Sequence, residues 1–459
     1  MRIQPTLFMI PKTEQSPSLG HSLFQMTWPM LFGVLSLMSF QLADSAFIGQ
    51  LGVAPLAAVG FTVPMYQLII GVQVGLGIAT TAVISKALGA KQEEHARQLG
   101  GLVVLIGASV IFILCLALWF TRAHILNALG GKPEILPTIS MYWQPWLVSA
   151  WLGAMLYFGY SLCRAHGNTL LPGITMVFAS LLNIALDPLF IFVFDWGLVG
   201  APYATITSFS IGCLIIYPKV LSRHWLSFKF DSGSKLSSIK QLGNITGPAM
   251  LSQFMPALSA MFATALIASY GTAAVAAWGL GTRLEFFSIV IVLALTMSMP
   301  PMIGRFLGAG DLESIRKLVK ISVKFVLLWQ LGVAIIWLLL SDRITGLMTT
   351  DLSVAEVLQQ YLLRVPLSYG ALGLCMMMVS VCNAMGLPMR ALLISCLRLF
   401  LCYLPMLWIG SAVAGIDGLL NGALIGNLAA GLMAWTLYQK GILKASEKHQ
   451  IIDASLQKN

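Results

Sequence analysis

The sequence predicts an all-α integral membrane protein with about twelve transmembrane helices arranged as two six-helix lobes. Hydrophobic residues make up 58% of the chain and charged residues only 10%, whereas soluble domains average about 25% charged residues. Apolar runs of about 20 residues, each long enough to cross a bilayer as a helix, recur along the whole chain. The second half also repeats the first, which indicates a duplicated membrane domain.

The apolar runs define the expected elements in order. The first lobe is expected at residues 26–221 and the second at 243–440, joined by the polar linker 222–242. Tails at 1–25 and 441–459 flank the lobes. The runs begin near Met26, Gly60, Leu99, Thr138, Leu171, Ala201, Ile245, Trp278, Leu318, Ala355, Met389 and Gly418.

Basic residues predict the orientation of these helices. The first twenty residues lack an apolar core that ends at a small-residue cleavage site, so we expect no removed signal peptide. If the helices alternate from a cytoplasmic N-terminus, most lysines and arginines fall in inner loops, and the outer loops keep little beyond Arg122, Lys132 and Arg343. This asymmetry follows the positive-inside rule and places both termini in the cytoplasm. Topology thus explains the net charge of +10, and no nucleic-acid partner is expected.

Cysteine and histidine patterns predict neither a metal site nor a cofactor. The seven cysteines occur singly, without a C-x-x-C pair, and the six histidines lack ligand spacing. Small apolar packing is the default role of such thiols.

An internal repeat at an offset of 219 residues relates the two lobes. Thr27 and Pro29 fall on Thr246 and Pro248, and the polar pair Glu94 and Arg97 falls on Glu313 and Arg316. Because six is an even number of helices, both lobes start on the same side of the membrane and the repeat is parallel. Two facing lobes of this kind are typical of transporters in which access to the substrate alternates.

Two acids lie within the apolar runs of the first lobe. Asp44 lies about sixteen residues into the first helix and Asp187 about sixteen into the fifth, at similar depths in the outer half. Asn183 shares a helix face with Asp187, and Phe40 and Gln41 share the face of Asp44. An acid at the bilayer centre costs about 2.5–3.5 kcal/mol on insertion scales, so a retained acid needs a reason.

The functional interpretation of the acids is an ion-coupling site. Burial and like charge both favour the neutral form of a carboxyl group, so one member of a close pair could carry a proton. The alternative is that Asp44 and Asp187 only hydrogen-bond neighbouring helices or reach interfacial water.

Other residues in the runs have two interpretations each. Pro29 is either a hinge that bends the first helix or a proline at a first turn, where it is tolerated without a kink. Arg283 and Glu285 are expected to snorkel at the outer end of the eighth helix or to pair with loop groups, and the alternative is that they carry substrate. Arg364 and Arg398 are interpreted as structural.

Several stretches resemble the MATE multidrug exporters. These stretches are WPML and LADSAFIGQLG in the first helix, GLGIATTAVISKALGA in the second, SLCRAHGNTLLPG, LLNIALDPLFIF in the fifth and WGLVGAPYAT. The similarity covers about Met26 to Lys440 and is greatest to the bacterial DinF branch.

The resemblance implies roles for named residues. In that branch Asp44 would be the coupling carboxylate, with Pro29 at the bend of its helix. Asn183 and Asp187 would complete a polar network in the first lobe, with Tyr142 and Thr205 lining it beside Gln41 and Phe40.

Two departures from the family pattern limit the comparison. The NorM branch carries coupling acids on the seventh or tenth helix, whereas those helices here read LSQFMPALSAMFATALIA and YGALGLCMMMVSVCNA, without an acid. Ion coupling in the second lobe is therefore not expected. Phe40 also stands where DinF relatives often carry a tyrosine, which removes one hydroxyl from the network.

The resemblance implies a cation-coupled antiporter, not an enzyme, that exports cationic or amphipathic organic compounds from the bacterial inner membrane. We expect a monomer that exchanges drugs for protons and needs no cofactor. Two alternatives stay open: a sodium-coupled exporter that uses the same acids, and a flippase of related fold for lipid-linked precursors. A flippase would need several basic residues in its cavity to meet phosphate, and the first lobe offers none.

Overall fold

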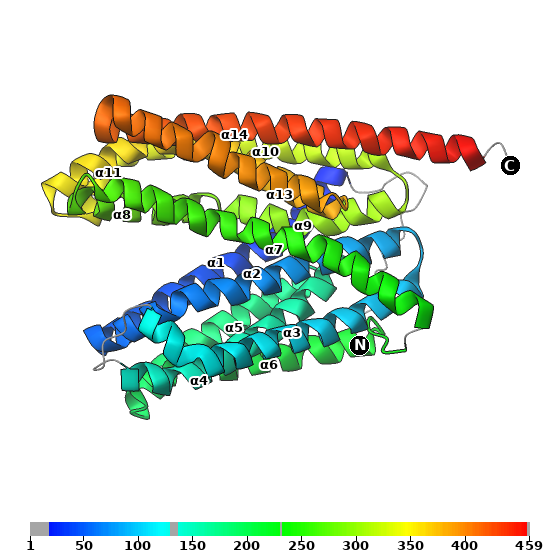
Figure 1. The fold of residues 1–459 in the computed structure, drawn as a ribbon, viewed down its shortest axis with the longest axis horizontal. Helices are drawn as coiled ribbons and strands as arrows, with labels where there is room; N and C mark the ends of the chain where they lie inside the picture. Colours follow the sequence, from blue (N-terminus) through cyan, green and yellow to red (C-terminus); the bar gives the residue numbers. More distant parts are fainter. Residues whose placement is uncertain (1–17, 129–135, 230–231, 457–459) are drawn as a thin grey trace.

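The computed structural model describes residues 18–128, 136–229 and 232–456, and every regular element in these residues is a helix. The N lobe (Figure 1, blue to green) comprises six helical spans. Their elements are α1 (Leu19–Gln50), α2 (Val53–Gly89), α3 (Glu93–Ala128), α4 (Leu136–Ala165), α5 (Leu170–Pro188) with the π-helix η1 (Leu189–Val193), and the short η2 (Gly197–Val199) with α6 (Gly200–Ser222).

The C lobe (Figure 1, green to red) is built from more fragments. They are α7 (Ser232–Ala268), α8 (Thr272–Ser288), α9 (Val290–Gly308), α10 (Leu312–Met348), α11 (Leu352–Arg364), η3 (Val365–Ser368), α12 (Tyr369–Ala384), α13 (Pro388–Leu397), the π-helix η4 (Arg398–Tyr403) and α14 (Leu404–Leu456).

Twelve spans follow from these elements, as the sequence predicts. Eleven helical stretches in the described residues are long and apolar enough to cross a membrane. The last of them, Pro388–Ile442, reverses direction inside α14, where Ala414 and Gly415 leave helical geometry and Gly415 has a φ of 60°. Gly410 and Gly418 pack backbone to backbone beside this turn. The stretch therefore contains two antiparallel spans, which brings the count to twelve.

The repeat holds at the level of elements. Adding 219 to the bounds of α2 gives residues 272–308, which is the extent of α8 and α9 together. In the C lobe this span is interrupted at Ile289 (φ −93°, ψ 6°). The Ser288 carbonyl oxygen accepts a hydrogen bond from Gln330 Nε2 on α10 at 3.0 Å, and Ser288 Oγ accepts one from Trp337 Nε1 at 2.9 Å. Side chains of α10 thus bond to Ser288, the last residue of α8 before the break.

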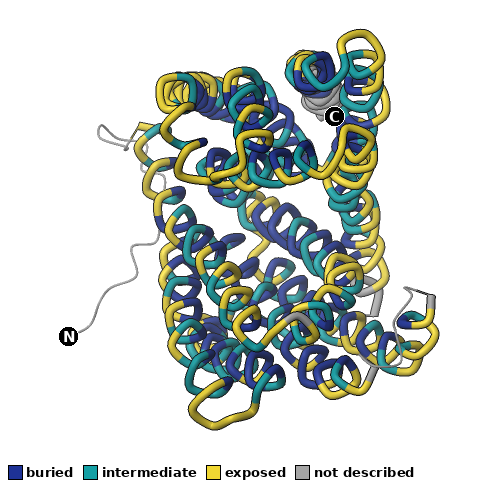
Figure 2. Tube along the Cα trace, turned by 90° about the vertical axis from the view of Figure 1, so that its left-hand side faces the viewer, coloured by how far each residue is buried: buried dark blue, intermediate teal, exposed yellow. Residues whose placement is uncertain are grey.

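Burial separates the interior of each lobe from its surface (Figure 2). One buried apolar cluster lies mainly in the C lobe and two lie mainly in the N lobe, and one of these two extends to Leu242, Ile245 and Ala294 of the C lobe. Many large apolar side chains are nevertheless exposed, among them Leu214, Leu339 and Val413. An apolar surface of this extent is typical of a protein that contacts lipid.

The lobes meet closely at one end, here called the basic end because Lys86, Lys91 and Arg305 lie there. At Gly89 on α2, an added Cβ atom would collide with the backbone carbonyl of Arg305 on α9, and Gly308 stands in the same relation to Lys86. Arg305 Nη2 also donates a hydrogen bond of 2.6 Å to the His166 carbonyl oxygen of the N lobe. Glycine therefore permits a backbone-to-backbone approach of the lobes here.

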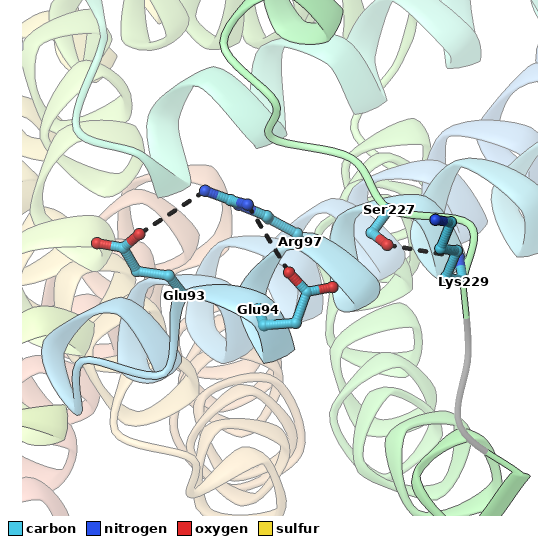
Figure 3. Close-up of polar contacts among 5 residues, drawn as sticks. All are labelled: Glu93, Glu94, Arg97, Ser227 and Lys229. Atoms are coloured by element: carbon cyan, nitrogen blue, oxygen red, sulfur yellow. Dashed lines mark hydrogen bonds and ion pairs between the residues drawn. The ribbon is translucent and has the colours of Figure 1, made fainter.

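Part of the linker lies against the N lobe (Figure 3). The Ser227 amide donates a hydrogen bond of 2.9 Å to the Arg97 carbonyl oxygen on α3, and Ser227 Oγ accepts one from the Lys229 amide at 3.4 Å. The Arg97 side chain lies 3.8 Å from Glu93 and 3.7 Å from Glu94. These exposed ion pairs lie within α3 and contribute little stability, whereas the backbone bond ties the linker to α3, where Gly100 and Gly101 also pack closely against Trp225 and Ser227.

Two expected boundaries differ from the structure. The first helix begins at Leu19, capped by Ser18 Oγ, which accepts a hydrogen bond from the His21 amide at 3.3 Å. The residues just before Met26 are therefore helical. At the other end, α14 continues to Leu456, beyond the expected end of the second lobe at residue 440.

Candidate functional site

Asp44 lies on α1 and is only partly exposed. Its Oδ1 atom is buried and has no hydrogen-bond partner among the described residues, and no ion pair in the described part of the chain includes this acid. A buried polar atom without a partner is rare in folded proteins and requires an explanation, such as a bound ion or a change of protonation.

Asp187 and Asn183 are fully buried on α5. When the Asn183 amide is oriented to satisfy its neighbours, its Nδ2 donates to Asp187 Oδ2 at 2.9 Å. Its Oδ1 then accepts hydrogen bonds from Thr205 Oγ1 and the Thr205 amide, both at 3.1 Å. Asn183 therefore links the second acid to α6, and the predicted relation of Asp187, Asn183 and Thr205 is present in the structure.

Tyr142 on α4 connects the two acids. Its buried phenol lies close enough to both Asp44 and Asp187 to interact electrostatically, and Asp44 and Asp187 interact in the same way with each other. Tyr66 on α2 joins this group through Asp44 and Tyr142. The sequence analysis missed Tyr66, although the repeat offset could have drawn attention to it, because the residue 219 positions later is the acid Glu285.

The lining residues divide into two kinds. Phe40 packs edge-on against Phe209 of α6, with ring centroids 6.4 Å apart, which places it in apolar packing between α1 and α6. Gln41 is exposed, and only its backbone carbonyl is engaged, by Ser45 Oγ at 2.9 Å. The structure therefore does not bring Gln41 into the polar network.

Pro29 lies inside α1, ten residues after the helix begins. The first-turn interpretation is therefore wrong, because at this depth a proline removes an intrahelical hydrogen bond. The backbone of Pro29 also faces Gly173 on α5, where an added Cβ atom would lie 2.5 Å from the Pro29 carbonyl oxygen. α5 thus packs closely against α1 at the turn where Pro29 removes a backbone hydrogen bond.

The expectation for Glu285 is wrong as well. Glu285 does not pair with a loop group at a helix end: its Oε2 accepts a hydrogen bond of 3.0 Å from Tyr361 Oη on α11, inside the C lobe. Arg283 is exposed on the same helix. Arg364 forms an ion pair with Asp417 at 2.9 Å, which agrees with a structural role.

In the described part of the chain, no group of three or more histidine, cysteine, aspartate or glutamate side chains is placed to hold a metal ion. The seven cysteines are free thiols. The polar groups gathered inside the N lobe are thus two carboxyl groups with hydroxyl and amide partners.

Two six-helix lobes of membrane-spanning helices, with carboxyl groups inside them, are typical of polytopic membrane transporters. The chain belongs to the MatE family, whose model matches residues 29–189 and 248–409. Members of this family are transporters that export drugs and toxic compounds, and they are not enzymes.

Individual relatives agree with this assignment. The chain is 32% identical to the FAD transporter of Shewanella oneidensis over 440 residues, which cover 93% of this chain and 95% of that protein. It is 25% identical over 447 residues to the multidrug export protein MepA of Staphylococcus aureus, covering 95% and 97% of the two chains.

Solved structures extend the comparison to the fold. The chain is 56% identical to the Vibrio cholerae MATE transporter VcmN in its bent form, with a TM-score of 0.92 and coverage of 94% and 98%. A MATE protein in a straight conformation shares the fold at a TM-score of 0.87 and 22% identity, with coverage of 94% and 97%.

Proposed function

We propose that this chain exports cationic or amphipathic organic compounds in exchange for protons, and that Asp44 is the proton-binding group. The observation that carries this proposal is the buried Asp44 oxygen without a hydrogen-bond partner, beside Asp187 and Tyr142. A proton on Asp44 removes a charge that no ion pair compensates.

The network around Asp44 gives the proton a structural effect. Asn183 ties Asp187 to Thr205, so the second acid is held in place while Asp44 is not. Neutralising Asp44 removes its repulsion from Asp187 and lets α1 move toward α5. The proline-weakened turn at Pro29 is the natural place for α1 to bend. In this mechanism that motion reduces the space for substrate in the N lobe.

The driving force sets the achievable gradient. A membrane potential of about 100 mV supplies about 2.3 kcal/mol per charge moved. At about 1.4 kcal/mol per tenfold change, one proton can hold a neutral compound at about a fifty-fold gradient. A monovalent cation exchanged for one proton moves no net charge, so only the pH difference would drive that exchange.

The test is efflux of a fluorescent organic cation from proteoliposomes under separately imposed proton and sodium gradients. Wild type should respond to the proton gradient alone, and Asp44→Asn should lose efflux because it cannot change charge. Asp195→Asn is the matched control, since Asp195 is an exposed acid outside the network. Efflux that survives in Asp44→Asn overturns the proposal, and efflux driven by sodium alone assigns the same acids to sodium coupling.

A second substrate class is favoured by one observation. The relative at 32% identity is a FAD transporter, so a flavin dinucleotide is the alternative cargo. Such an anion would be exported with its own negative charge, which the membrane potential assists. Efflux of FAD, with no efflux of the organic cation, would select this alternative over drug export.

We also propose that the basic end faces the cytoplasm of a bacterial inner membrane, with both termini on that side and the chain acting as a monomer. The supporting observation is the excess of lysine and arginine there. The described network of the N lobe contains no basic side chain to meet phosphate. This disfavours a flippase for lipid-linked precursors, and it counts equally against the pyrophosphate of FAD.

A further inference from the structure

The C lobe contains a carboxyl group that the proposed proton site in the N lobe does not use. Glu285 Oε2 accepts a 3.0 Å hydrogen bond from Tyr361 Oη. The Tyr361 ring is 1% exposed, packs edge-on against Trp278 at 5.4 Å between centroids, and fits against Gly281, where a Cβ atom would leave no room. The hydroxyl that meets Glu285 is therefore fixed in place by packing.

This pair occupies the positions of a pair in the N lobe. Adding the repeat offset of 219 to Tyr66 and Tyr142 gives Glu285 and Tyr361. The counterpart of Asp44 is Ala263, so the first helix of the C lobe has no acid at that position. Each lobe thus places a carboxyl group near the equivalent tyrosine, Tyr142 in the N lobe and Tyr361 in the C lobe. In the N lobe this acid comes from α1, whereas in the C lobe it comes from α8.

Four ionisable groups lie close enough to Glu285 to interact with it electrostatically. They are Tyr361 on α11, Tyr369 on α12, and Arg398 and Tyr403 on η4. Within the described residues, α7, α9 and α10 contribute no ionisable group to this interaction. No ion pair in the described chain includes Glu285. Its negative charge meets the Tyr361 hydroxyl directly and Arg398 only at longer range.

Both lobes also carry a π-helix beside their polar cluster. In the N lobe η1 begins two residues after Asp187, and in the C lobe η4 itself supplies Arg398 and Tyr403. π-helical turns are rare and occur frequently at functional sites. This shared feature is independent of the Glu285 hydrogen bond.

We propose that Glu285 is a second proton-binding carboxyl group of this transporter, operating in the C lobe with Tyr361 as its hydrogen-bond donor. This inference rests on the proposed function as a proton-coupled exporter. When Glu285 is charged, Arg398 attracts it and holds α8 near η4. When a proton binds to the carboxylate, that attraction is lost and α8 is released.

A proton fits this site better than a metal ion does. Hard cations require several oxygen ligands, and Glu285 stands as a single carboxylate among tyrosine hydroxyls and one arginine. No cluster of three possible metal ligands occurs in the described residues.

Infrared titration of the purified full-length protein tests the site without transport. The carbonyl stretch of protonated carboxyl groups should contain a component that disappears in Glu285→Gln and survives in Asp44→Asn. Tyr361→Phe should shift this component, because the donor is lost, but not remove it. Glu356→Gln is the control, since Glu356 is an exposed acid of α11. The glutamine variant keeps an acceptor for Tyr361, and thermal unfolding checks that it folds.

A titration of Glu285→Gln that is identical to wild type overturns the proposal, and so does a component that sodium displaces at constant pH. In proteoliposomes, losing one coupled charge should lower the limiting gradient up to about fifty-fold at about 100 mV. An unchanged gradient in Glu285→Gln overturns the coupling role. If wild type shows no proton-driven efflux, the proposed function fails, while the infrared result still decides whether Glu285 binds a proton.

Discussion

At the scale of single residues, His166 shows how the basic end is assembled. Its ring stacks on Trp225 of the linker at 4.2 Å between centroids, its Nδ1 lies 3.0 Å from the Leu162 carbonyl oxygen, and its own carbonyl accepts from Arg305. One loop residue therefore contacts the linker, its own helix and the opposite lobe.

The stability of this contact should depend on pH. Burial lowers the pKa of His166 to about 4 from 6.5; the hydrogen bond to Leu162 opposes that change, and the charges of Arg305, Arg223 and Arg97 add to it. The unfolded chain then binds more protons than the folded one between pH 6.5 and 4, so stability is complete above this window and falls as pH decreases through it.

We expect the unfolding temperature in detergent to fall between pH 6.5 and 4, and His166→Gln to show a smaller fall because glutamine does not titrate. His124→Gln, in the exposed last turn of α3, is the control and should keep the wild-type profile. Equal slopes for His166→Gln and wild type would contradict the assignment.

The sequence predicts the N-lobe acids well and the C-lobe acid poorly, for a physical reason. Asp44 and Asp187 stand alone in apolar helices, so burial alone makes them conspicuous. Glu285 has Arg283 two positions earlier, which suggested a helix end near water. Only tertiary packing, which brings Tyr361 from α11 against α8, shows that this acid faces inward.

At the scale of elements, α1 is the helix whose mechanics matter most. It is one continuous helix of 32 residues with Pro29 in its interior, and Thr27 Oγ1 contacts Ser298 Oγ on α9 at 2.8 Å. The N-terminal part of α1 is thus hydrogen-bonded to the opposite lobe, while Asp44 lies on the C-terminal side of the turn that Pro29 weakens.

Pro29→Ala should restore the missing hydrogen bond and stiffen α1. We expect the efflux rate to fall several-fold and the unfolding temperature to stay the same or rise, because an interior proline destabilises a helix. Pro248→Ala in α7, the repeat counterpart, is the control. A stiffened α1 with wild-type efflux would show that bending at Pro29 is not needed.

Helix boundaries depend on contacts that a hydropathy pattern does not contain. The start of α1 at Leu19 depends on the Ser18 cap, and the reversal within α14 depends on Gly415 at positive φ. The long apolar stretch 389–440 predicts two spans by length. The break at Ile289, in contrast, is braced by Gln330 and Trp337 of α10, which a hydropathy pattern does not place there.

At the scale of the whole molecule, the basic end joins the two lobes by close backbone packing. Gly89 and Gly308 permit this approach, and Arg305 completes it. Any transition that opens this end must separate these groups and leave the His166 carbonyl to another partner.

Gly89→Ala should therefore favour the open basic end, because its methyl group meets the Arg305 backbone. Spin labels at the exposed repeat counterparts Glu94 and Glu313 measure the separation of the lobes, and we expect a population at longer distance. Gly332→Ala on α10 is the control, since nothing lies within 4 Å of its added methyl. An unchanged distance distribution would mean that the backbone contact does not limit opening.

The interruption at Ile289 distinguishes the two lobes mechanically. The N-lobe counterpart, α2, is one continuous helix with Pro64 in its interior, whereas the C-lobe span is interrupted, with α10 bracing the interruption through Ser288. Glu285 lies on one side of this interruption and Arg305 on the other. The segment that carries Glu285 can consequently tilt while α9 remains docked against the N lobe. A change at Glu285 can therefore move α8 without separating the two lobes.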